Sequence, residues 1–91
     1  MRVTIRGQVW RLTWVRAFED ERAGEADDEQ RAIRVLRSLS DREKLRVVLH
    51  ELLHAEMWDL AEECVDRVST TMAGVLWRLG WRPRRSDGPA T

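Results

Sequence analysis

The chain has 91 residues, and its 16 basic residues balance its 16 acidic residues to a formal net charge of zero. A neutral chain of this length suits one domain of modest stability, and no bulk field draws it to nucleic acid or to an anionic membrane. No apolar run approaches the roughly 18 residues of a membrane span, and the single cysteine, Cys64, has no partner for an internal disulfide, so we expect a cytoplasmic protein.

Strands are predicted in the first third of the chain. Residues 1–16 predict a β-hairpin around an Arg6-Gly7 turn, because apolar and polar residues alternate on both sides of it. Residues 17–31 are acidic, lack periodicity and predict a mobile loop. Ala32–Leu36 predicts a third strand, which we expect at an exposed edge of the sheet. The alternating apolar positions of the hairpin are Val3, Ile5, Trp10, Leu12 and Trp14.

Two helices are predicted next. Ser40, with Glu43 three residues later, forms a capping box and predicts the start of the first helix. This helix has two apolar faces, one suited to the sheet and the other in need of cover from the last helix. We expect Asp59 to cap the last helix and Gly80 to end it. The sheet-facing stripe is Leu45, Val48, Leu49 and Leu52, and the roughly opposite face carries Val47, His50 and His54.

These elements predict an α+β fold, in which a small three-stranded antiparallel sheet (β-β-β) is followed by two helices that cover one of its faces. Residues 1–81 would form a single domain. Residues 82–91 are polar and contain proline and glycine, so they predict a disordered C-terminal tail.

The sequence HELLH, residues 50–54, contains both histidines of the chain. On a helix, His50 and His54 lie one turn apart on the same face, so both imidazoles can reach one metal ion. Glu51 is rotated by about 100° from His50, where it can meet a metal-bound water without binding the metal itself. The alternative is a buried polar pair, in which each imidazole bonds to a backbone carbonyl or to water.

Catalytic zinc takes three protein ligands, and no third histidine exists, so the third ligand must be a carboxylate. Glu62 lies at the edge of the apolar stripe of the last helix and can point toward the first helix, with Glu63 as the alternative ligand. Glu62 is also the third residue after Asp59, so a capping role for it stays open. Asp66, one turn later, suits either a partner that orients a histidine or a solvated surface residue.

The segment HELLHAEMWDLAEECV, with the hairpin before it and LWRLGW after it, resembles the minimal zincins of phages and bacteria, which are similar to small gluzincins. The resemblance covers residues 32–81 and, loosely, the hairpin. It implies that His50, His54 and Glu62 bind Zn²⁺ and that Glu51 is the general base of a metallopeptidase. The chain has no tyrosine, so an arginine that the sequence does not single out would have to stabilise the oxyanion.

Two functions follow from these residues. The first is a zinc-dependent metallopeptidase that acts on a protein or peptide substrate, alone or within a larger assembly. The second is a non-catalytic interaction module in which zinc only staples two helices together. Nucleic-acid binding through Arg11 and Arg34 is disfavoured, because alternating arginines on a sheet are usually its solvated face and acidic residues balance them here.

Overall fold

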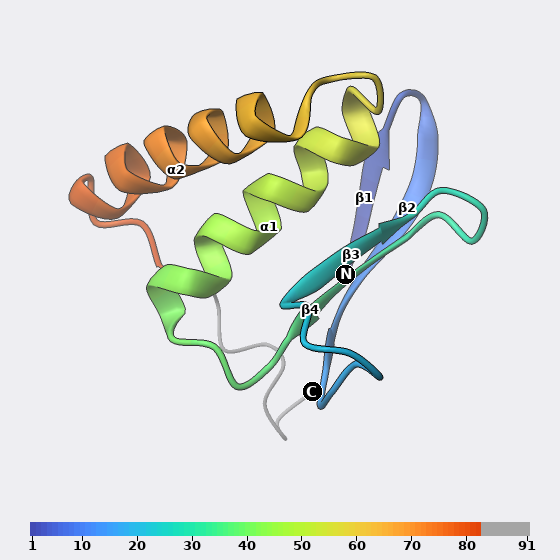
Figure 1. Ribbon diagram of the computed structural model, residues 1–91, viewed down its shortest axis with the longest axis horizontal. Helices are drawn as coiled ribbons and strands as arrows, with labels where there is room; N and C mark the ends of the chain where they lie inside the picture. Colours follow the sequence, from blue (N-terminus) through green and yellow to red (C-terminus); the bar gives the residue numbers. More distant parts are fainter. Residues whose placement is uncertain (83–91) are drawn as a thin grey trace.

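The computed structural model describes residues 1–82 and has an α+β architecture, as the sequence predicts. Helix α1 lies between α2 and the sheet (Figure 1). Residues 83–91 of the predicted tail lie outside the described residues, and Arg82, its first residue, stacks on the ring of Trp77. The elements are β1 (Arg2–Ile5), β2 (Gln8–Val15), β3 (Gly24–Asp27), β4 (Ala32–Leu36), α1 (Asp41–Glu56) and α2 (Glu62–Arg78).

The predicted hairpin is present. Strands β1 and β2 pair antiparallel, with Ile5 opposite Gln8 across a two-residue connection. Arg6 and Gly7 both have positive φ, 50° and 79°, which gives the turn the twist that a tight hairpin requires. The inward-facing side chains of Ile5 and Trp10 are each 2% exposed, so the alternation in the sequence correctly identified the core side of the hairpin.

The sheet differs from the prediction in number, direction and order of its strands. It has four strands in the order β1-β2-β4-β3, and β2 pairs parallel with β4. The three-stranded antiparallel sheet is therefore wrong, although Ala32–Leu36 is a strand as predicted. That strand is not at an edge, because it lies between β2 and β3. The edges are β1 and β3.

Strand β3 lies within the segment that was predicted to be a loop. It pairs antiparallel with β4, and Glu25 stands opposite Arg34 in the register. The Arg34 guanidinium forms ion pairs with the carboxylates of Glu25 and Asp27, the latter at 3.6 Å. The strand has no apolar alternation because its other side carries only Gly24 and Ala26. Small residues on one face and cross-strand ion pairs on the other replace the usual pattern.

Helix α1 begins where the sequence predicts, and the Ser40 side chain accepts a hydrogen bond from the Glu43 backbone N–H at 3.2 Å. One expectation about its faces is wrong. Val47 is buried in the core with the sheet residues instead of lying on the opposite side. The reason is the close approach of β3, since a Cβ built on Gly24 would lie 2.7 Å from Val47 Cγ1. Val48 and Leu52 pack against the same core, as predicted.

Helix α2 starts later than predicted. Its N-cap is Ala61, which offers no side-chain hydrogen bond, and Asp59 lies in the connection before it. Glu62 is therefore the first helical residue and cannot be the third residue of a capping box. The end of the helix agrees with the prediction, because Gly80 has a φ of 94° and its N–H binds the carbonyl of Trp77.

Helix α2 packs on α1, not on the sheet, so the two helices do not both cover one sheet face. The buried residues of α2 are Val65, Ser69 and Ala73, spaced four apart, and their small side chains let the helices approach closely. Within residues 1–82, neither helix combines the length and apolarity needed to cross a membrane.

The contact of β3 with α1 gives a test of the fold. Gly24→Ala should lower the free energy of unfolding by about 1–3 kcal/mol, because the added methyl group overpacks the contact with Val47. Urea denaturation in the presence of a chelator measures the change. The matched control is Gly74→Ala in α2, where a Cβ meets nothing within 4 Å and the substitution should stabilise the helix by up to about 1 kcal/mol. Unchanged stability of Gly24→Ala would contradict the close packing described here.

Candidate metal centre

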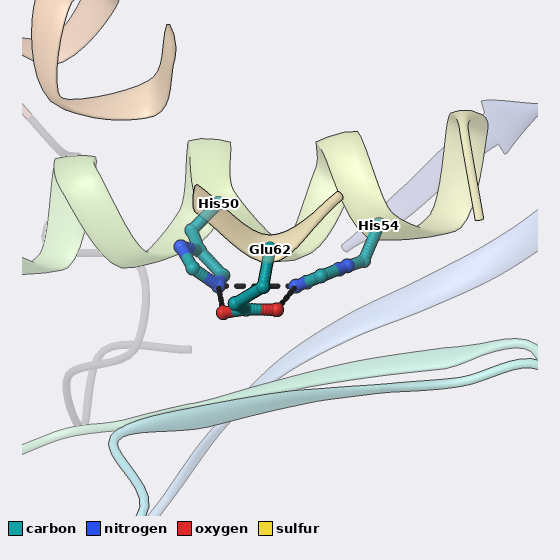
Figure 2. A group of neighbouring side chains, drawn as sticks. All are labelled: His50, His54 and Glu62. Carbon is teal, nitrogen blue, oxygen red and sulfur yellow. Dashed lines mark hydrogen bonds and ion pairs between the residues drawn. The ribbon is translucent and has the colours of Figure 1, made fainter. Parts of the chain in front are cut away.

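The two histidines project from one side of α1 toward the start of α2 (Figure 2). Their Nε2 atoms lie 3.1 Å apart, and the ring centroids are 4.7 Å apart in an edge-on arrangement. The His50 side chain is 14% exposed and that of His54 is 27% exposed, so both rings are partly withdrawn from water. The spacing of four residues thus brings two imidazole nitrogens to one point, as the sequence predicts.

Glu62 completes this group from the first turn of α2. Its Oε2 lies 3.2 Å from His50 Nε2, and its Oε1 lies 3.0 Å from His54 Nε2. The position follows from the short connection after α1, which turns the chain back so that α2 begins over the histidine face. Glu63, the alternative ligand, is one residue further round the helix, exposed and outside this group. Cys64 is half-buried, also outside the group, and its Sγ accepts a hydrogen bond from Arg67 at 3.5 Å.

The separations within the group suit a tetrahedral metal. Two ligand atoms held at about 2.05 Å from zinc in tetrahedral geometry are about 3.3 Å apart. The two Nε2 atoms are 3.1 Å apart, and each lies 3.0–3.2 Å from a different oxygen of the Glu62 carboxylate. One donor atom from each of the three residues lies within 4.8 Å of the other two. Two imidazole nitrogens and a carboxylate are also a known ligand set of catalytic zinc, which leaves a fourth position open. The residues therefore fit a zinc ion in both geometry and chemistry.

Asp66, one turn after Glu62, approaches the other nitrogen of His50. Its Oδ1 lies 3.1 Å from His50 Nδ1, although the two atoms are not aligned as a hydrogen bond and Nδ1 is buried without another partner. A carboxylate at this position favours a proton on Nδ1. The Nε2 lone pair is then directed at the candidate metal position among His50, His54 and Glu62, which we call the metal group. The sequence left Asp66 either as a partner that orients a histidine or as a solvated surface residue. The structure favours the first interpretation, with His50 as the histidine.

Glu51 lies between the histidines and the sheet and is 8% exposed. Burial, together with the negative charges of Glu62 and Glu25, raises the pKa of its carboxyl group to about 7, whereas Arg22 opposes the shift. A bound metal dication would also oppose it, because a nearby positive charge favours the ionised carboxylate. Glu51 is therefore a withdrawn carboxyl group beside the metal group whose proton affinity lies near neutral pH, as general bases require.

The metal group opens into a cavity of about 380 Å³ between α1, the start of α2 and β3. Besides the three ligands, Glu51 and Asp66, this cavity is lined by Arg22 and Arg46. Arg22 binds Asp20 and Glu25, and Arg46 binds Glu43. The sequence did not single out these two arginines, because only the position of β3 brings Arg22 to the site. The spacing of Arg46 four residues before His50 was the one available signal.

His50, His54 and Glu62 are the one group of three or more histidine, cysteine or acidic side chains that could hold a metal ion in the part of the chain described here. No protein-family model, curated protein or solved structure matches the chain. The resemblance to minimal zincins therefore stays a prediction from the sequence.

The ligand assignment predicts a difference between two neighbouring glutamates. Glu62→Ala should weaken zinc binding by about tenfold or more, because the carboxylate 3.0 Å and 3.2 Å from the two imidazoles is lost. Glu63→Ala, the matched control, should leave the affinity within about twofold of the wild type. Competition with a fluorescent zinc chelator measures both values. If only Glu63→Ala lost affinity for zinc, the third ligand would be Glu63, and the assignment of Glu62 would be wrong.

Proposed function

We propose that the protein is a zinc-dependent hydrolase that cleaves peptide bonds in a protein or peptide substrate. The observation that carries the proposal is the convergence of His50, His54 and Glu62 beside the buried carboxyl group of Glu51. A metal site alone does not require an acid at this position. Burying a carboxyl group in a small core is costly, so its location beside an open metal position favours a role in catalysis.

The roles of the residues follow from their positions. His50, His54 and Glu62 would hold the zinc, with Asp66 orienting the ring of His50. When bound, the zinc would lower the pKa of a water molecule to around 7 and polarise the carbonyl group of the scissile bond. Glu51 would accept the proton of the attacking water and deliver it to the leaving amine, so the same carboxyl group acts first as a base and then as an acid.

The substrate would lie along β3. This strand is at the edge of the four-stranded sheet, and its residue Gly24 lines the same cavity as the metal group. An extended peptide that pairs with the open side of β3 would pass in front of Glu51. Our expectation from the sequence that Ala32–Leu36 offers the edge is excluded, because both sides of that strand are already paired.

One observation favours the second function, a zinc-stapled interaction module. Helix α2 packs mainly on α1 through small residues, and Glu62 is its first residue. A metal ion that joins Glu62 to the two histidines would fasten α2 to the rest of the molecule, whether or not the site is catalytic. In that case Glu51 would have no chemical task.

Glu51→Gln separates the two functions. The amide keeps the shape of the side chain but cannot accept a proton, so it should reduce hydrolysis of a casein substrate by about a hundredfold or more while zinc stays bound. Zinc content and proteolysis are measured on the same preparation, with Glu56→Gln at the exposed end of α1 as the control. Full activity of Glu51→Gln would refute the role of the general base. A zinc-loaded wild type that cleaves no substrate would favour the module.

A further inference from the structure

A second cavity lies beside the first, at the end of α1. It has a volume of about 260 Å³ and is bordered by β2, β3, α1 and the connection to α2. Glu51 and His54 line both cavities, so the second one adjoins the metal group. We infer that this cavity binds one apolar side chain of the substrate, preferably an aromatic one, next to the bond that is cleaved. The inference rests on the function proposed above.

The walls of this cavity suit an apolar group. Trp10 is 2% exposed and gives the cavity a rigid floor within the core. Ala26 of β3 and Ala55 of α1 have short side chains, and both line the hollow. The volume lies below the range of drug-sized sites, about 300–1,000 Å³, and is therefore suited to a single side chain.

Trp58 forms the outer wall. It lies in the connection between α1 and α2, and its side chain is 73% exposed although it borders the cavity. Because this large indole ring is exposed in the free protein, packing an incoming ring against it would remove much apolar surface from water. The same connection ends at Glu62, so the wall and the third metal ligand are fixed by one short segment of chain.

The strand geometry explains how one peptide would reach both the metal group and this cavity. Gly24 lines the first cavity and Ala26 lines the second, and residues two apart on a strand face the same side. A peptide paired with β3 would keep the same period. Its scissile bond would lie near Glu51 and His54, and a neighbouring side chain would point between Ala26 and Trp58.

The first cavity is lined by more charged side chains than the second. The cavity at Gly24 is lined by two arginines, by the two histidines and by three acidic groups, which are Glu51, Glu62 and Asp66. Its arginines already form ion pairs with Asp20, Glu25 and Glu43. It therefore offers little to an apolar ring and no free cation for a carboxylate. The cavity at Trp58 has Asp28 at its rim, with a side chain that is 76% exposed and a carboxylate that lies 3.7 Å from the guanidinium of Arg6, so its charge is also paired.

A pair of hydroxamates tests the inference without relying on catalysis. Calorimetry on the zinc-loaded protein compares acetohydroxamic acid with 3-phenylpropanohydroxamic acid, which adds a phenyl ring to the same chelating group. The phenyl compound should bind at least about tenfold more tightly, because the ring is buried against Trp10 and Trp58. Trp58→Ala should reduce this ratio to about threefold or less, since the outer wall is removed.

Two further variants control for indirect effects. Trp81→Ala removes another exposed tryptophan, 56% exposed and outside the cavity, and should leave the ratio unchanged. Ala26→Leu should lower the ratio by filling the space, and its far-ultraviolet circular dichroism shows whether it folds. Equal affinities for the two hydroxamates in zinc-loaded wild type, or a ratio that neither Trp58→Ala nor Ala26→Leu reduces, would overturn the inference while the metal site stands. Failure of the protein to bind zinc would instead overturn the proposed function beneath it.

Discussion

The packing of α1 between the sheet and α2 determines the position of every residue of the candidate metal centre. One side of the helix is buried with the sheet through Val47 and Ala55, and another side receives the small residues of α2. The histidines lie at the border between these two contacts. They are consequently shielded from both directions but remain accessible from the side of β3. Strand β3 approaches α1 most closely at Gly24, where any side chain would collide with Val47 of α1.

This packing places a carboxyl group where a small core would ordinarily exclude one. A pKa raised from 4.5 to about 7 means that the fold disfavours the ionised form of Glu51 by about 3 kcal/mol. That is a substantial share of the stability of a domain of this size. A dication held by His50, His54 and Glu62 would relieve much of this cost and join α2 to α1 at the same time. Metal binding and folding are therefore expected to be strongly coupled in this protein.

The sequence predicted the elements whose signals are local. The hairpin was recognised from the alternation around Arg6-Gly7, α1 from its capping box at Ser40, and the end of α2 from Gly80. Strand β3 was missed because Gly24 and Ala26 are too small to produce an apolar alternation. Its pairing with β4 is stabilised instead by the ion pairs of Arg34, which depend on a partner strand. Strand direction and order are properties of the whole sheet, and no local pattern specifies them.

The candidate site was easier to predict than the sheet around it. Two histidines four residues apart on a helix must share a face, so His50 and His54 required only the helix to form. Glu62 was selected by its helical position, although the helix begins at that residue instead of at Asp59. The sequence could not predict the residues that line the two cavities. Arg22, Ala26 and Trp58 lie beside the metal group only because of the topology of β3 and the path of the α1–α2 connection.

The central claim is that these three side chains hold one zinc ion, and X-ray absorption at the zinc edge of natively purified protein tests it most directly. We expect about one equivalent of zinc, surrounded by two imidazole nitrogens and by oxygens at about 2.0–2.2 Å, with no sulfur. Absence of zinc from the native protein, or a sulfur ligand at about 2.3 Å from Cys64, would contradict the account.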